Sequence, residues 1–229
     1  MSSPTESEFS RLSAASLSGR DLHQMLRAED SAHAQRVADL CFAMAVAMNQ
    51  SSDAAAAIAA AAHWHDVGKV VVDPMLLNKP AALTPHEKMA VDRHVWHGYS
   101  ILQLQAGSNS ELAATVALLH HERFNGGGHP FALRAEAIPL IARITSVADV
   151  YDALISVRPY KPAWPRDQVL AHIDAERGRH FDPACVDALF AVLEVGGSGR
   201  LLHRGLAGLA QLRVRGRQLT GGNSEFRVV

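Results

Sequence analysis

The sequence predicts an all-α helical bundle, and three features of its pattern support this. Apolar residues recur at three- and four-residue steps through most of the chain, which is the period of an amphipathic helix. Strand-like alternation is nearly absent before the last part of the chain. Helix start signals precede several periodic stretches, most clearly the capping-box pattern at 84–87. The 229 residues are enough for one substantial core, with or without a small appendage.

Composition narrows the class of protein. Hydrophobic residues make up 48% of the chain but no run is long enough to span a bilayer, so we expect a soluble protein without a membrane partner. Residues 1–20 lack an apolar stretch behind a basic start, which predicts a disordered lead-in rather than a secretory signal. Cys41 and Cys185 are far apart, which favours a reducing cytoplasm. The net charge of −1 gives no general reason to expect a nucleic acid polymer.

The first predicted helix covers residues 21–48 and carries an unusual buried face. Its inward positions are Leu22, Met25, Leu26, Val37, Leu40 and Met44. No apolar member of this stripe lies between Leu26 and Val37. At the same helical spacing, the positions between them are Glu29 and His33, which are four residues apart on the same face. A buried carboxylate usually finds a charged partner or a metal ion. An ion pair with Arg27 or Arg36 is the simpler alternative.

The second predicted helix starts at a cap among residues 51–53 and runs through an alanine-rich stretch. We expect Gly68 to end it in a left-handed turn. This places His65 and Asp66 at the end of a buried helix, with Lys69 just beyond. An imidazole and a carboxylate side by side can both bind metal, and a carboxylate can bridge two ions, but the dipeptide alone is a weak signal.

Three further predicted helices bring histidine or aspartate to a buried face or a helix end. The helix that begins at the capping box carries His94 and His97, of which one is expected to face the interior; the alternative is that both are surface residues. The next ends at His120 and His121. In the helix after that, Asp149 interrupts an otherwise apolar face in the way Glu29 does.

These separate signals predict a multinuclear metal centre. The candidate ligands are Glu29, His33, His65, Asp66, His94, His120, His121 and Asp149. The set is too large for a single ion, and mixed imidazole and carboxylate ligands suit iron, manganese or zinc better than magnesium or calcium. The alternative is a group of unrelated core histidines, each with its own hydrogen bond.

Five motifs in order resemble the HD-GYP family of HD-superfamily phosphohydrolases, which degrade cyclic di-GMP. They read HDVGK, LNKPAALTPHE, HVWHGYSIL, HHERFNGGGHP and ADVYDALISVRPYK. The resemblance covers about residues 21–195 and implies an all-helical HD domain around a metal centre. It also implies two or three divalent ions, with iron or manganese favoured.

The resemblance assigns roles to particular residues. His65 and Asp66 match the family's namesake catalytic pair, with Asp66 bridging metals, and Glu29 resembles the extra carboxylate of members with three metals. The other ligand positions are matched by His33, His94, His120, His121 and Asp149. Lys69, Arg158 and Lys161 match positions associated with the substrate phosphates, which suits their charge.

Two departures from the family pattern lie in the glycine-rich segment. Gly-Tyr-Pro is replaced by Gly128, His129 and Pro130, and an aspartate of the pattern is replaced by Asn125. We expect this segment to form a rim that a nucleotide contacts, so Asn125, Gly128 and His129 join the predicted substrate-binding residues. His129 could weaken binding, replace the tyrosine through its own ring or change nucleotide preference. A solvent-facing turn residue is the plainer alternative.

The resemblance implies a metal-dependent phosphodiesterase in which metal-activated water attacks cyclic di-GMP, giving linear pGpG and/or GMP. Lys69 is a candidate for stabilising charge in the transition state, and Glu122 is expected to accept a hydrogen bond from a ligand histidine. Two alternatives are a degenerate module that binds a cyclic dinucleotide or a signalling partner without turnover, and a phosphohydrolase of another nucleotide.

Residues 196–229 differ in character from the predicted catalytic domain at 21–195. From residue 197 onward this basic extension has six arginines against one acid and alternates apolar and polar residues around a Gly-Gly-Asn turn. A small C-terminal β-hairpin, a partner-docking tail and a solvated tail are the three interpretations. Because the lead-in is short, we expect regulation through a partner protein, this extension or a homodimer.

Overall fold

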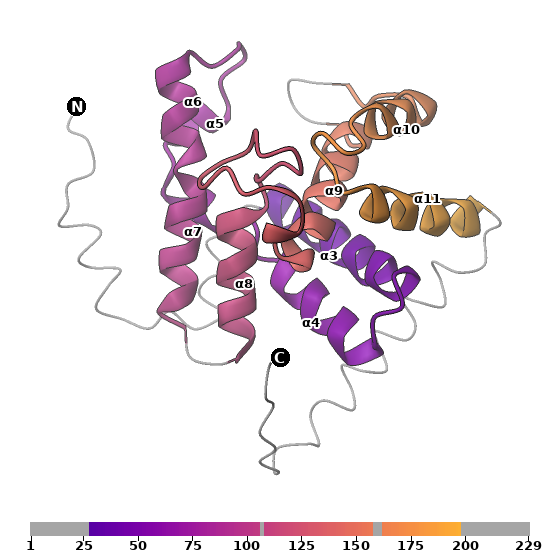
Figure 1. Ribbon diagram of the computed structural model, residues 1–229. Coiled ribbons are helices and arrows are strands. Elements are labelled where there is room, and N and C mark those ends of the chain that lie inside the picture. The colour runs from indigo at the N-terminus through magenta and orange to yellow at the C-terminus, as the bar shows by residue number, and fades with distance from the viewer. Residues whose placement is uncertain (1–27, 106–107, 158–161, 198–229) are drawn as a thin grey trace, which may run out of the picture.

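A computed structural model describes residues 28–105, 108–157 and 162–197, which are helical and contain no strand (Figure 1). The longer helices are α3 (Ala28–Ala47), α4 (Ser52–Ala62), α6 (Pro85–Asp92), α7 (His94–Gln103), α8 (Ser108–Leu119), α9 (Leu140–Ile155), α10 (Arg166–Ala175) and α11 (Pro183–Gly197). Three short elements are η1 (Val67–Val71), α5 (Pro74–Leu77) and η2 (Ala135–Ala137). The predicted all-α class is confirmed. The lead-in at 1–20, the start of the first predicted helix and the C-terminal hairpin lie outside the described residues.

The hydrophobic core lies between α3, α4, α8, α9 and α11. Helix α9 packs against α3, α10 and α11, while α7 lies alongside α8 (Figure 1). The stripe predicted for the first helix is confirmed at Val37 and Met44, which are fully buried, and Ile144 of α9 and Leu189 of α11 join them. Burial of each such side chain stabilises the fold by roughly 1.5–3 kcal/mol.

Helix α4 packs closely because its buried face is almost entirely alanine. Ser51 caps its start by accepting a hydrogen bond from the Ala54 N–H at 3.2 Å, as predicted. The helix ends earlier than expected, at Ala62, and residues 63–66 form a turn that leads into η1. His65 and Asp66 therefore sit on a tight turn rather than on the last turn of a long helix.

Gly68 serves a different purpose from the one predicted. It lies inside η1 and not in the left-handed conformation that would end a helix, so that prediction is wrong. A Cβ at this position would lie 2.0 Å from the His94 carbonyl oxygen and 2.4 Å from the Gly98 nitrogen. Glycine is required here because the backbones of η1 and α7 touch.

The predicted capping box at the start of α6 is confirmed. Thr84 Oγ1 accepts the Glu87 N–H at 3.3 Å, and Glu87 Oε2 accepts the Thr84 N–H at 2.8 Å. Lys79 also donates to both Glu87 oxygens, at 2.8 and 2.6 Å. The hydrogen bond from Lys79, followed by those from Thr84, lowers the pKa of Glu87 to about 2. The helix start and the loop after α5 are thereby joined.

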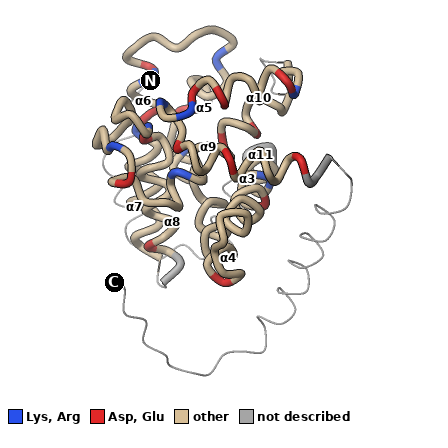
Figure 2. The backbone as a smooth tube through the Cα atoms, turned by 45° about the vertical axis from the view of Figure 1, so that its right-hand side comes forward, with Lys and Arg blue, Asp and Glu red and all other residues tan. Residues whose placement is uncertain are grey.

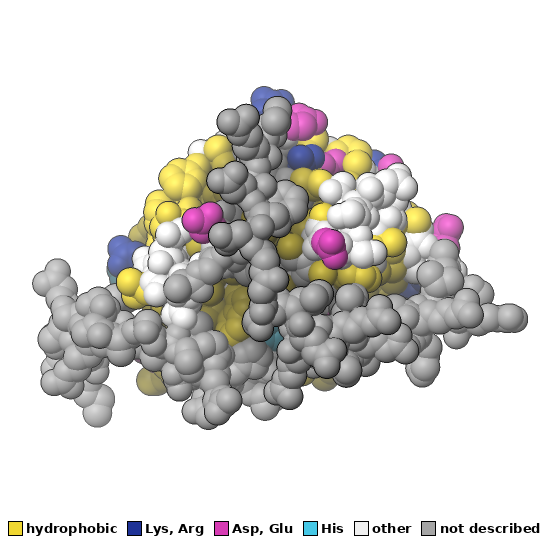
Figure 3. Space-filling model, turned by 90° about the horizontal axis from the view of Figure 1, so that it is seen from below, with side chains coloured by type: hydrophobic (Ala, Val, Ile, Leu, Met, Phe, Trp, Pro, Cys, Tyr) yellow, Lys and Arg dark blue, Asp and Glu magenta, His cyan; other side chains and the backbone are white. Residues whose placement is uncertain are grey.

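The described surface carries both signs of charge. Lys and Arg are interspersed with Asp and Glu along the helices (Figure 2), in keeping with the near-zero net charge. On the face shown in Figure 3, hydrophobic side chains lie beside isolated acidic ones. Among the described helices, none has the length and apolar character needed to cross a membrane.

Gly68→Ala is expected to lower the free energy of unfolding by about 1–3 kcal/mol or more, because the added methyl group clashes with backbone atoms, which cannot rotate out of the way as a side chain can. Urea denaturation measures the change. Gly98→Ala probes the same contact more gently and should cost less: its Cβ would lie 3.1 Å from the Ala117 Cβ and 3.3 Å from the Gly68 nitrogen, and higher helix propensity offsets part of the cost. Equal stability of Gly68→Ala and wild type would contradict the close contact.

Glu87→Gln is expected to lower the melting temperature at pH 7 and to have less effect in acid. A carboxylate whose folded pKa is depressed stabilises the protein above its unfolded pKa, and this contribution is lost as pH falls through the folded value. The difference between variant and wild type should therefore shrink between the ordinary value of 4.5 and about 2. Calorimetry across this range measures it, and a gap that stays constant would show that the charge of Glu87 contributes nothing.

Candidate metal centre

Three buried histidines each present Nε2 toward Asp66. His65, His94 and His120 each place Nδ1 near a backbone carbonyl oxygen three or four residues earlier, at 2.9, 2.7 and 3.1 Å. A carbonyl only accepts, so Nδ1 donates and, in the neutral ring, Nε2 keeps a free lone pair. Helix geometry supplies these carbonyls, because each histidine follows or begins a helical turn.

Four buried polar atoms at this point have no hydrogen-bond partner. They are the Nε2 atoms of His65, His94 and His120 and Oδ1 of Asp66. Buried polar atoms are nearly always hydrogen-bonded in folded proteins. Four such exceptions close together, all of them good metal-ligand atoms, fit bound divalent cations.

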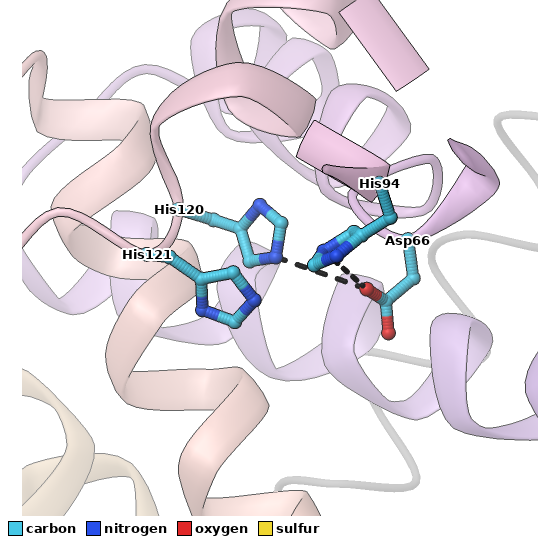
Figure 4. A group of neighbouring side chains, drawn as sticks. All are labelled: Asp66, His94, His120 and His121. Carbon is cyan, nitrogen blue, oxygen red and sulfur yellow. Dashed lines mark ion pairs between the residues drawn. The ribbon is translucent and has the colours of Figure 1, made fainter. Parts of the chain in front are cut away.

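The ligand atoms form two adjacent groups, in each of which all the atoms lie within 4.8 Å of one another. One comprises Asp66, His94, His120 and His121, and the other His33, His65 and Asp149. In Figure 4 the side chains of the first group point toward one another from the turn before η1, the start of α7 and the segment just after α8. Seven of the eight predicted ligands are thus brought together. Glu29, the eighth, belongs to α3, but its side chain is not described.

Asp66 connects the two groups. Its Oδ1 lies 3.3 Å from His94 Nε2, and its Oδ2 lies 3.3 Å from His65 Nε2. One oxygen therefore faces each group, which is the arrangement of a carboxylate able to bridge two ions. Lys69 Nζ lies 2.5 Å from the same Oδ2.

Two buried carboxylates, Asp66 and Asp149, give the centre a negative charge that positive charge must balance. Burial alone would lower the pKa of His65, yet the carboxylates of Asp66 and Asp149 raise it to about 10. Burial would raise the pKa of Asp66, but Lys69 and His65 hold it well below its ordinary value. Both carboxylates thus remain ionised and draw a proton onto His65. A bound cation would take the place of that proton.

His121 and His120 differ from His65 in their protonation. Burial lowers the pKa of His121 to about 3 and that of His120 well below its ordinary value. Both rings are therefore neutral at pH 7, which is the form that binds metal.

His33 is oriented by a residue that sequence reasoning passed over. Asp152 Oδ2 lies 2.6 Å from His33 Nδ1, while Asp149 Oδ1 lies 3.1 Å from His33 Nε2. Arg36 donates to both oxygens of Asp152, at 2.6 and 2.8 Å. Carboxylates commonly fix ligand histidines in this way. The available signal was that Asp152 follows Asp149 by three residues on the same face of α9.

The glycine-rich segment lies beside the first group. The His129 ring centroid is 5.1 Å from that of His121, and Asn125 Oδ1 accepts the Gly127 N–H at 2.9 Å. Substrate contacts by Asn125, Gly128 and His129 stay predictions. Arg158 and Lys161 lie outside the described residues.

The prediction for Glu122 is wrong. It was expected to accept a hydrogen bond from a ligand histidine. Its two oxygens instead accept the backbone N–H groups of Phe131, at 2.7 Å, and Leu133, at 3.0 Å. Glu122 therefore holds the far side of the glycine-rich segment.

Comparison with known proteins agrees with this geometry. The HD domain family matches residues 22–185, well over half of the chain. The chain belongs to the HD-domain family. This HD domain also resembles a solved HD-GYP-type protein, Bd1817 from Bdellovibrio bacteriovorus, with a TM-score of 0.59 at 17% identity over 80% of this chain and 60% of that one. That likeness shows a shared fold.

Curated relatives of the HD domain are phosphodiesterases by name. The cyclic di-GMP phosphodiesterase response regulator RpfG of Xanthomonas campestris is 45% identical over 69% of this chain and 42% of its own length. A 3′3′-cGAMP-specific phosphodiesterase 2 of Vibrio cholerae is 38% identical over 70% of this chain and 31% of its own. A cyclic di-GMP phosphodiesterase of Thermotoga maritima is 36% identical over 70% of this chain and 44% of its own length. The chain thus spans less than half the length of these relatives.

Asp66→Ala is expected to remove the ions of both groups, because each of its oxygens faces one group. His65→Ala and His94→Ala should each deplete the group they belong to. Elemental analysis after anaerobic purification measures the ion content per chain. His86→Ala, at an exposed histidine of α6, is the control and should keep the full content. A folded Asp66→Ala variant with full metal content would show that this assignment of the centre is wrong.

Proposed function

We propose that this HD domain is a metal-dependent phosphodiesterase that hydrolyses cyclic di-GMP to linear pGpG and/or GMP. The observation that carries the proposal is Asp66, whose two oxygens face two adjacent groups of metal-ligand atoms. The relatives are named as cyclic di-GMP and 3′3′-cGAMP phosphodiesterases, which supports a cyclic dinucleotide as the substrate class.

The proposed cofactors are two divalent ions, with iron or manganese favoured and a third ion at Glu29 as a further proposal. His94, His120 and His121 would hold one ion, His33, His65 and Asp149 the other, and Asp66 both. When bound, such ions supply a water of lowered pKa and spread the negative charge that develops on the phosphoryl group. The mixture of imidazole and carboxylate ligands supports first-row transition metals over magnesium or calcium.

The remaining roles belong to side chains at the edge of the centre. Lys69 Nζ, at 2.5 Å from Asp66, is close enough to share the charge of the bridging carboxylate and of a phosphoryl oxygen beside it. Arg158 and Lys161 are proposed to bind the substrate phosphates, and His129 to contact the substrate. In-line attack would break a 3′–5′ phosphodiester bond, and the leaving 3′ oxygen would take up a proton.

A second candidate keeps the chemistry and changes the nucleotide. It is favoured by the 38% identity to a 3′3′-cGAMP-specific phosphodiesterase and by His129, which stands where the family pattern has tyrosine. A module that binds without turnover is less well supported, because seven candidate ligands meet in one place. A cytoplasmic location, a signalling partner and a homodimer stay predictions.

Anaerobically purified protein with its metal load measured is expected to convert cyclic di-GMP to pGpG or GMP, seen by chromatography. Parallel incubations with 3′3′-cGAMP and with bis(p-nitrophenyl) phosphate, a small aryl diester, separate the candidates. Cleavage of 3′3′-cGAMP but not cyclic di-GMP would select the second candidate. Full metal content with none of the three diesters cleaved would reject the enzyme in favour of a binding module.

Lys69→Met should keep the metal content but lower kcat by about 10²–10³, the usual loss when one donor to a developing negative charge is removed. Steady-state kinetics beside elemental analysis measures both. Lys79→Met, which removes a lysine paired with Glu87 on α6, is the control for loss of a cation and should leave kcat unchanged. A Lys69→Met enzyme with wild-type kcat would remove Lys69 from the proposed mechanism.

A further inference from the structure

Glu122 is a buried carboxylate next in sequence to the candidate ligand His121. Only 2% of its surface is exposed. Oε1 accepts the Phe131 N–H at 2.7 Å and Oε2 accepts the Leu133 N–H at 3.0 Å. These hydrogen bonds join residues nine and eleven positions apart and close the glycine-rich segment into a loop. We call residues 123–131 the rim loop.

The rim loop is pressed onto the same short piece of backbone at two more points. The His129 N–H donates to the His121 carbonyl oxygen at 3.3 Å. A Cβ on Gly128 would lie 2.3 Å from the Arg123 nitrogen and 2.5 Å from the Glu122 Cα. The loop therefore lies flat against residues 121–123, with Glu122 underneath it.

This packing positions two side chains of the rim loop, one beside the candidate ligand His121 and one against Trp96. The His129 ring lies 5.1 Å from the ring of His121. Phe131, about half exposed, lies with its ring 5.4 Å from that of Trp96, also about half exposed. Glu122 binds the backbone N–H of Phe131 directly. The backbone N–H of His129 is held by the carbonyl oxygen of His121, the residue before Glu122.

We propose that Glu122 is a positioning residue: it holds the rim loop against the metal centre and thereby sets the affinity for a substrate large enough to reach the loop. This rests on the proposed cyclic dinucleotide activity. A small aryl diester fills the metal centre without needing the loop, whereas a cyclic dinucleotide extends beyond the cleaved phosphate. Loss of the anchor thus raises KM for the dinucleotide more than for the small diester.

The carboxylate is suited to this role because two N–H donors need two acceptors. Glutamine has the same shape but only one acceptor oxygen, and its NH₂ group would face one of the two backbone N–H groups. Glu122→Gln therefore leaves a buried donor without an acceptor at the base of the loop, while the metal ligands are untouched.

The test compares metal-loaded wild type with Glu122→Gln by hydrogen exchange and by kinetics on cyclic di-GMP and bis(p-nitrophenyl) phosphate. We expect exchange at Phe131 and Leu133 to speed up at least tenfold. We also expect kcat/KM for cyclic di-GMP to fall at least tenfold relative to that for the aryl diester, chiefly through KM. The control Glu136→Gln makes the same chemical change at an exposed residue of η2 and should alter neither.

Gly128→Ala disturbs the same packing from the opposite side and should speed exchange at Phe131 and Leu133 in the same way, which keeps the test open if Glu122→Gln fails to fold. Only exchange is compared for this variant, because Gly128 is itself a predicted substrate-binding residue. Unchanged exchange at Phe131 and Leu133 would overturn the proposal. An equal fall in kcat/KM on both substrates together with a lower metal content would also overturn it, because Glu122 would then support the candidate ligand His121 and not the rim loop. Hydrogen exchange can be measured without substrate turnover. If the wild type leaves cyclic di-GMP intact, the proposed function is rejected, and exchange still shows whether Glu122 holds the rim loop.

Discussion

The charge of one buried carboxylate governs the arrangement of this protein. Asp66 lies on a turn between α4 and η1, with a histidine nitrogen at 3.3 Å from each of its oxygens. A carboxylate in such a place is unfavourable unless positive charge surrounds it. Lys69 supplies part of that charge, and the histidines around it supply nitrogen lone pairs that can share a cation. The contact between η1 and α7 and the hydrogen bonds from histidine Nδ1 atoms to backbone carbonyls keep these groups in place.

The helices deliver ligands by their ends more than by their faces. His94 begins α7, His120 and His121 follow α8, and His65 and Asp66 follow α4. At a helix end a side chain can turn back and donate to a carbonyl oxygen three or four residues earlier, as three of the histidines do. The second group is different. His33 and Asp149 come from the interiors of α3 and α9, where Asp152, held by Arg36, supplies the orienting bond to His33.

Periodicity predicted the fold class and most of the ligands because both depend on which residues face the interior. Asp149 could be found because it interrupts an apolar stripe, and His120 and His121 because they close one. The role of Gly68 could not be predicted, since the contact that requires glycine is made by α7, which is distant in sequence. Glu122 was misread for a similar reason. Its position beside a ligand suggested a bond to histidine, but the donors it binds come from backbone nine and eleven residues later.

The contact between Gly68 and the backbone at His94 and Gly98 also bears on how the centre tolerates ions of different size. No side chain lies between η1 and α7 at this contact, so His94 cannot drift relative to the turn that carries His65 and Asp66. In the proposed metal centre, adjustment to ions of different radius would therefore fall to the side chains of Asp66 and Asp149 more than to His94.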